Sequence, residues 1–420
     1  MSVESPNVLL PSRPLAVTSL PLPLRNPLCW FCLGLSFLSG LAINVLPVTF
    51  KVFQKVFGAG YEMQGRTEGL YFVGALLGSL AAGYLSTRLS LKYSARLGLL
   101  LGGTGCLLIG ASRRAETAQF GALIMGMGAT WVTIIYGAIV AAYFQSIRQK
   151  IFAAISLSMA IGGFLSPLLV GMYMSRAWLM LNWPWWVPYV VLASGFFLLT
   201  GAVPNLPELS SVQRVEPGKQ GHFRVLLRSG GLWLIGLLMV LHGIGQVGAV
   251  TWLGRLYQAR LSLDESQVGM MISANLTGFI LGRLFWTRWG DWLPDRIVLG
   301  VSAGIGASFY LLTILTHQFW LGLIFICIAG MGMSGDAISL NSLTASHFRN
   351  LAAKAFAIIQ ALGQMGAALG PYLIGYLGER AGTLQHSIWI VPVTIGSLSV
   401  AGFAWYLLDR ASPRALEARR

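Results

Sequence analysis

Three polar side chains lie inside long apolar segments of this sequence and could exchange a proton or hold a ligand there. Asp336 follows a glycine-rich stretch, and His242 and Gln246 are four positions apart in an earlier segment, which places them on one face of a helix. An ionised carboxylate in hydrocarbon costs several kcal/mol unless it is protonated or paired, and histidine titrates near neutral pH. Asp336, which we take as the sole carboxylate deep inside an apolar segment, and His242 are therefore candidates for a proton-linked site.

The alternative for these side chains is structural. Asp336 could hydrogen-bond a backbone bent at its glycines, and His242 could be a packed histidine. Gln246 and Asn44 could each bond a neighbouring helix, as polar residues of membrane helices often do.

A second set of polar and aromatic residues is expected to face the same cavity. Asn44 ends a stripe of small polar residues, Ser36, Gly40 and Asn44, spaced i, i+4 and i+8. Three further candidates, two of them with rings that could stack on a substrate, are Thr133, Tyr136 and Trp252. Most tryptophans of such a sequence belong instead to the belts at the membrane interfaces.

Several kinds of chemistry are missing from the sequence. It has no G-x-x-x-x-G-K-[ST] phosphate loop, so ATP is not expected to act on it directly. Cys29 and Cys32 form a C-x-x-C pair, but zinc needs two more ligands and none follow nearby. We therefore expect no enzymatic activity, no cofactor and no metal.

The elements that position these residues are membrane helices. Of 420 residues 55% are apolar and 10% charged, whereas a soluble domain has about 25% charged residues. The apolar residues come in blocks of roughly 20, the length that crosses a bilayer as a helix. We predict an all-α membrane protein with twelve transmembrane helices, at residues 28–50, 67–88, 95–112, 118–143, 151–174, 185–203, 231–253, 267–287, 297–316, 319–343, 354–377 and 386–408.

The net charge of +15 lies mostly on one set of connections between these helices. That set includes both termini and the central loop, and the positive-inside rule then places all of them in the cytoplasm. The distribution favours a lipid bilayer as the partner of the basic residues and argues against nucleic acid. We expect a multi-pass protein of the plasma membrane, in bacteria the inner membrane, with a cytoplasmic tail at 1–27, a cytoplasmic linker at 204–230 and a cytoplasmic tail at 409–420.

The two halves of the chain, 28–203 and 231–408, resemble each other. Gly69, Gly78, Thr87, Arg88 and Arg96 recur 200 positions later as Gly269, Gly278, Thr287, Arg288 and Arg296. Around Pro167 and Pro371, glycines recur at an offset of 204 as close-packing and bending points. Parallel six-helix repeats place a substrate site between them near the membrane midplane and allow one half to rock on the other.

The segment from Gly83 to Lys92 resembles the G-x-L-x-D-R-x-G-R-K loop of the major facilitator superfamily. It matches at Gly83, Leu85, Arg88 and Lys92. The resemblance implies the major facilitator fold and transport by alternating access. The second copy begins at Arg283 and keeps Arg288 and Gly290, and in both copies threonine replaces the aspartate of the family. The alternative for these arginines is an ordinary positive-inside signal. The residues implied to act as a conformational motif are Gly83, Arg88, Lys92, Arg283, Arg288 and Gly290.

Within the superfamily, residues 241–283 resemble the fucose-permease-like branch of sugar–proton symporters. Trp252, Gly278, Gly282 and Arg283 fit that branch, but Gln246 stands where it has an acid. The branch also has acids on helices one and four, which this sequence lacks. The resemblance implies a symporter.

Together, these features predict a monomeric secondary transporter that moves a small-molecule substrate, a sugar or an organic acid, with protons. One alternative is a drug or metabolite exporter of the same fold. Another is a membrane sensor or assembly protein that uses a carrier scaffold without transporting anything.

Overall fold

A computed structural model describes residues 26–85, 89–144, 147–179, 184–203, 226–348 and 351–411, and the regular elements in this part of the chain are all helices. The predicted tails and linker lie almost entirely outside the described residues. The helices are α1 (Pro27–Ile43), α2 (Val45–Phe57), α3 (Tyr61–Leu85), α4 (Leu91–Gly110), α5 (Ala115–Tyr143), α6 (Arg148–Leu179), α7 (Val187–Ala202), α9 (Gly230–Leu261), α10 (Glu265–Trp289), η5 (Gly290–Trp292, a 3-10 helix), α11 (Asp295–Leu315), α12 (Phe319–His347), α13 (Ala352–Ala381), α14 (Leu384–Ser387) and α15 (Ile390–Ala411).

The helices confirm the predicted all-α membrane architecture. Eleven segments in the described part of the chain are long and apolar enough to cross a membrane, with α1 and α2 counted as one segment. The shorter apolar helix α7 takes the place of the sixth predicted span. Each of the twelve predicted ranges therefore falls on an observed helix or on a pair of helices.

The first predicted helix differs from the structure because it is broken at Asn44. Asn44 has φ −116° and ψ 9°, and a second helix, α2, begins at Val45. Pro47 explains the break, since proline lacks the N–H that would bond the carbonyl of Ile43 and its ring collides with that carbonyl. The break leaves the side chain of Asn44 at the junction of two helix segments.

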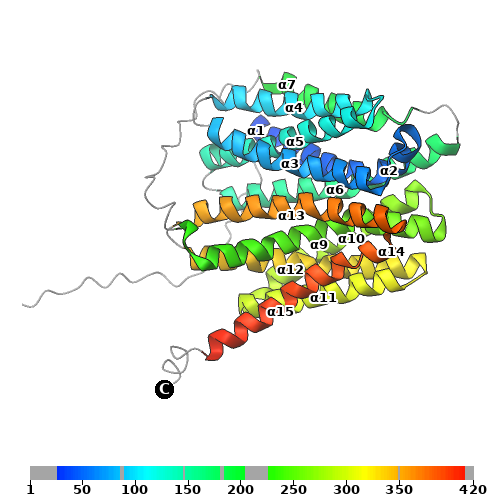
Figure 1. The fold of residues 1–420 in the computed structure, drawn as a ribbon. Coiled ribbons are helices and arrows are strands. Elements are labelled where there is room, and N and C mark those ends of the chain that lie inside the picture. The colour runs from blue at the N-terminus through cyan, green and yellow to red at the C-terminus, as the bar shows by residue number, and fades with distance from the viewer. Residues whose placement is uncertain are drawn as a thin grey trace, which may run out of the picture.

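The helices form two bundles that pack side by side. One hydrophobic core is formed almost entirely by α1 to α7, and a second by α9 to α15. Figure 1 shows the first bundle in blue to green above the second in green to red, with α6 and α3 facing α13 and α10 between them. The observed bundles are the two six-helix repeats that the sequence predicted.

Two pairs of helices, α3 with α13 and α6 with α10, join the bundles at closely packed glycines. A Cβ on Gly65 would lie 2.3 Å from the carbonyl oxygen of Pro371, and a Cβ on Gly269 would lie 2.1 Å from that of Pro167. Only a residue without a side chain permits such an approach. These contacts lie near one end of the helices, at the right of Figure 1 where α2 and α14 lie. We call this end the closed face and the opposite end the open face.

Candidate functional site: a cavity between the two halves

A cavity of about 510 Å³ lies between the two bundles. Residues of α1, α3 and α6 form one wall, and residues of α9, α10, α12 and α13 form the other. Apolar residues such as Phe72 and Phe279 alternate with polar ones along these walls. The polar lining residues are Asn44, Glu68, Ser156, His242, Gln246, Arg283, Asn341, Gln360 and Gln364.

The cavity leads toward the open face. Arg283 and Gln360, which line it on that side, are exposed, whereas Asn44 and His242 are buried deep inside. The amide of Gln360 donates a hydrogen bond to Asn341 Oδ1 at 3.2 Å, so two neighbouring wall helices, α12 and α13, are linked there. The cavity is therefore a deep pocket with its floor toward the closed face.

His242 and Asp336 form a buried pair on the second wall. Nδ1 of His242 lies 3.0 Å from Oδ1 of Asp336, and the Asp336 side chain has no exposed surface. The His242 side chain keeps 8% exposure and lines the cavity together with Gln246, one helical turn further along α9. Asp336 is not itself in the lining, so the imidazole is the member of the pair that reaches the cavity. Such a pair can take a proton from cavity water at the imidazole, while the carboxylate stabilises the charge.

Glu68 is a buried carboxyl that the sequence analysis missed. Its side chain lines the cavity from α3, the residue is 1% exposed, and Oε2 has no hydrogen-bond partner in the part of the chain that the structure describes. The prediction that Asp336 is the sole carboxylate deep inside an apolar segment is therefore wrong. Helix α3 begins at Tyr61 and not at residue 67, so Glu68 lies about two turns inside it.

A signal for the earlier start of α3 was present in the second repeat. Asp264 and Gln267 form a capping box at the start of α10, with Gln267 N donating to Asp264 Oδ1 at 2.8 Å. The spacing D-x-x-Q marks a helix that begins at residue 265. If the same helix start is applied 200 positions earlier, in the first repeat, the second helix begins at residue 65 and includes Glu68.

Asn44 lines the cavity from the break between α1 and α2. Its Nδ2 donates to the carbonyl oxygen of Gly163 on α6, with a distance of 3.4 Å. The side chain therefore ties two helices of the first bundle together and also presents its amide to the cavity.

Three predicted cavity residues lie elsewhere. Trp252 is fully buried toward the closed face, where its Nε1 donates to Pro371 O at 2.9 Å and its ring packs near those of Phe50 and Tyr61. Thr133 and Tyr136 are half-buried on α5, which contributes no residue to the cavity lining. None of the three therefore lines the cavity.

The motif residues that the structure describes lie toward the open face. Gly83 is exposed in the last turn of α3, Lys92 stands in the first turn of α4, and Arg88 lies outside the described residues. Arg288 is exposed in the last turn of α10 and Gly290 follows it. Arg283 differs from the others, because it lies further up α10 and lines the cavity.

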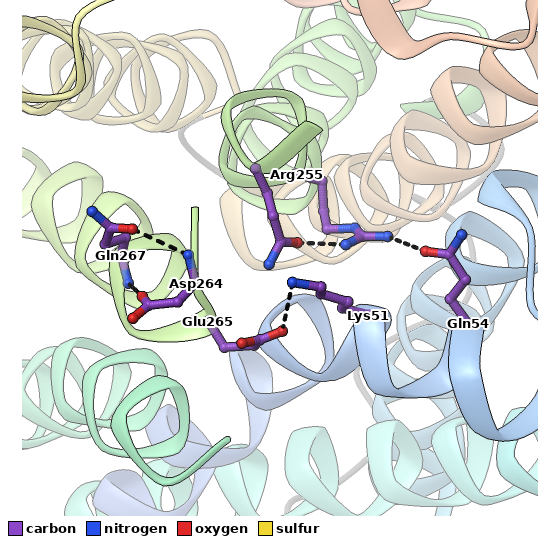
Figure 2. Close-up of polar contacts among 7 residues, drawn as sticks. Lys51, Gln54, Arg255, Asp264, Glu265 and Gln267 are labelled. Atoms are coloured by element: carbon purple, nitrogen blue, oxygen red, sulfur yellow. Dashed lines mark hydrogen bonds and ion pairs between the residues drawn. The ribbon is translucent and has the colours of Figure 1, made fainter. Parts of the chain in front are cut away.

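Polar contacts hold the two bundles together at the closed face (Figure 2). Lys51 Nζ on α2 lies 3.4 Å from Glu265 Oε1 on α10. Arg255 on α9 donates to Gln54 Oε1 on α2 at 3.0 Å and also to Gln258. Glu379 on α13 accepts a hydrogen bond from the backbone N–H of Tyr61 on α3. The closed face is thus sealed by charges as well as by close backbone packing.

Two bundles of six helices around a central cavity with one sealed face agree with the sequence pattern of one family. The pattern described as Major Facilitator Superfamily matches residues 32–264, which include most of α1, all of α2 to α7 and α9, and again residues 255–420, which include the end of α9 and α10 to α15. The chain belongs to the Major Facilitator Superfamily. Proteins named as transporters are among its relatives. A transporter of Sinorhizobium fredii called y4wD is 27% identical over 221 residues, and a protein of Agrobacterium vitis named as a candidate tartrate transporter is 25% identical over 163 residues.

These sequence matches are partial. They span 56% of the Sinorhizobium protein and 35% of the Agrobacterium protein, and 52% and 38% of this chain.

Solved structures of the superfamily match nearly the whole chain. A mutant of the nucleoside transporter NupG has a TM-score of 0.75 at 15% identity, covering 90% of this chain and 99% of that one. A bacterial homologue of the human lysosomal transporter Spinster, inward-facing and occupied, has a TM-score of 0.73 at 13% identity, with 94% and 100% covered. FucP in its outward conformation has a TM-score of 0.60 at 16% identity, with 89% and 97% covered. At these sequence identities the likeness shows that the chain shares the fold of these proteins.

Proposed function

We propose that this superfamily member is a proton-coupled carrier of a small neutral polar solute of the sugar class. The observation that carries the proposal is the His242–Asp336 pair, which is buried on the cavity wall with only the imidazole reaching the cavity. A carrier needs a group that binds a proton in one state of the cycle and releases it in another. The pair can do so without leaving a bare charge in the membrane interior.

The proposed substrate class follows from the polar groups of the cavity. Side-chain amides each supply donors and acceptors, and five of them line the cavity: Asn44, Gln246, Asn341, Gln360 and Gln364. Amides suit hydroxyl groups, which also both donate and accept. A volume of about 510 Å³ falls in the range of sites for small molecules.

An organic acid is the second candidate. Arg283 and His242 could bind its carboxylates, since arginine pairs with carboxylates in a bidentate geometry. The relative named as a candidate tartrate transporter supports this alternative. We favour the neutral solute because Glu68 lines the same cavity and would repel an anion when it is ionised.

The proposed orientation places the open face in the cytoplasm. The connections rich in lysine and arginine lie at that end of the helices, and the positive-inside rule assigns them to the cytoplasmic side. The conformation described here is then inward-facing, and the closed face belongs to the exterior of a plasma membrane. No chemical conversion of the solute is part of this proposal.

Uptake into proteoliposomes tests the proposal. Wild-type protein should accumulate labelled solute when a proton gradient is imposed, and Asp336→Asn should abolish accumulation. Exchange of labelled for unlabelled solute, which needs no net proton movement, should persist in the variant. Asp409→Asn is the matched control, because Asp409 pairs with Arg296 at the end of α15, away from the cavity. Accumulation by Asp336→Asn at the wild-type level would contradict the proposal.

A further inference from the structure

We infer that Glu68 is a second coupling residue, whose protonated carboxyl favours the conformation with the closed face sealed and whose ionised carboxylate favours opening of that face. The inference rests on the proposed proton-coupled function, and it adds the conformational step to which the proton is tied. Glu68 is in the first bundle, whereas the His242–Asp336 pair is entirely in the second.

The position of Glu68 on α3 links its burial to the contact between the bundles. It lies between Gly65 and Gly69, and both glycines pack on the backbone of α13. A Cβ on Gly65 would be 2.3 Å from Pro371 O, and one on Gly69 would be 2.8 Å from Ala368 O. Next to these contacts, Ala367 of α13 shares the cavity lining with Glu68. Separation of α13 from α3 would widen the cavity beside the carboxyl and admit water to it.

No group around Glu68 compensates a negative charge in the part of the chain that the structure describes. Tyr71 of α3 and Tyr189 of α7 lie within electrostatic range of it, but phenols are neutral near pH 7. Cys106 of α4, which acts on the same two tyrosines, is a neutral thiol there. His242 faces it from α9 across the cavity, and its imidazole is already paired with Asp336.

The remaining charged groups of the helices packed against Glu68 stand at the helix ends. Glu62 and Arg66 precede it on α3, and Arg66 is exposed. On α13, Glu379 and Arg380 are near the closed face, with Glu379 bonded to Tyr61 N. Lys354 stands at the opposite end of α13. An unpaired carboxylate at 1% exposure costs several kcal/mol unless it holds a proton, so the closed conformation favours the protonated form.

The sign of the coupling follows. Protonation of Glu68 should favour the closed conformation, and ionisation should favour separation of α3 from α13. At the opened closed face the carboxylate would take a proton from water, and protonation would then favour closure. Loss of that proton to cavity water that communicates with the open face would leave a buried charge and favour reopening. Because one proton is involved, the ratio of closed to open molecules should fall by up to tenfold for each pH unit.

Distances between spin labels in substrate-free protein measure this ratio without a transport assay. Labels at Glu116 and Gln318, introduced by Glu116→Cys and Gln318→Cys, span the bundles at the closed face, since both residues are exposed there. Labels at Tyr93 and Trp292 span the open face in the same way. The four native cysteines, Cys29, Cys32, Cys106 and Cys327, are first replaced.

In wild-type protein, raising the pH should shift the closed-face distances to longer values and the open-face distances to shorter ones. Glu68→Gln, which keeps the shape of the side chain but cannot ionise, should keep the short closed-face distance at every pH. Glu62→Gln, six positions earlier on the same helix, is the matched control and should respond as wild type does. A pH response retained in Glu68→Gln, or none in wild type, would overturn the inference.

A second variant protects the test against misfolding. Glu68→Asp retains a carboxyl but withdraws it by one methylene group, so the pH midpoint of the distance shift should move. An unmoved midpoint counts against Glu68. The two proposals fail in different ways. If the pH response of the label distances does not depend on Glu68 but proton-driven uptake is intact, this inference alone is rejected. If the pH response depends on Glu68 but no proton-driven uptake occurs, the proposed function is rejected.

Discussion

Three ionisable side chains of the cavity, Glu68, His242 and Arg283, differ in how the structure balances their charge. His242 has a buried partner, Arg283 reaches solvent at the open face, and Oε2 of Glu68 has no hydrogen-bond partner in the part of the chain that the structure describes. Buried unpaired charges are rare in proteins because they are costly. At the residue scale, we therefore propose different roles for the three side chains: proton exchange at His242 with Asp336, coupling at Glu68, and contact with solute or solvent at Arg283.

The role of Arg283 distinguishes the two substrate classes. If the solute is neutral, Arg283→Gln should change the KM for uptake by less than about fivefold, because a neutral hydrogen bond contributes only about 1 kcal/mol. An organic acid would lose a charge-assisted bond of about 1.5–3 kcal/mol, roughly a tenfold to hundredfold loss of affinity. Competition of labelled-solute uptake by hexoses and by tartrate, in wild type and variant, measures the difference. A hundredfold effect confined to acids would favour the second candidate.

At the scale of the elements, glycines determine where the two bundles can touch. Gly65 of α3 packs on the carbonyl of Pro371 in α13, and Gly269 of α10 packs on the carbonyl of Pro167 in α6. Backbone carbonyls cannot rotate out of the way as a flexible side chain can. These two contacts therefore fix how closely the bundles approach each other at the closed face.

A methyl group at Gly65 should weaken that seal. In Gly65→Ala the new Cβ would meet Pro371 O at 2.3 Å, and overpacking of this kind costs about 1–3 kcal/mol. The ratio of closed to open molecules should then fall by about tenfold or more, which the distance between labels at Glu116 and Gln318 would report. Gly137→Ala on α5 is the control, since nothing lies within 4 Å of its Cβ position. Equal distances in both variants would show that the seal depends on other contacts.

At the scale of the whole molecule, the charge distribution predicts which face meets the cytoplasm. Tyr93 lies at the open face and Glu116 at the closed face, and both are exposed. In intact cells, a membrane-impermeant thiol reagent should label Glu116→Cys and leave Tyr93→Cys unlabelled until the membrane is permeabilised. Labelling of the two sites in the reverse order would invert the proposed orientation and make this conformation outward-facing.

The sequence alone determined the architecture. Membrane helices can be recognised from short stretches of sequence, because a helix that crosses the hydrocarbon core needs about 20 consecutive apolar residues and the charged residues lie in the connections. The repeated glycines and prolines then paired Gly69 with Gly269 and Pro167 with Pro371, which placed a cavity between two halves. His242 and Gln246 were found because polar residues in such segments are few and their spacing puts them on one face.

The tertiary structure decided which side chains reach the cavity. Hydropathy gives depth in the membrane but not the rotation of a helix about its axis, so Trp252, Thr133 and Tyr136 were expected in the cavity and lie outside its lining. Hydropathy also predicts that a helix begins where apolar residues begin. Because the first turns of α3 are polar, the predicted helix began too late for Glu68 to be recognised as lying inside it. Those turns are helical and buried because Gly65 packs on the backbone of α13, a contact between residues some 300 positions apart that no local pattern contains.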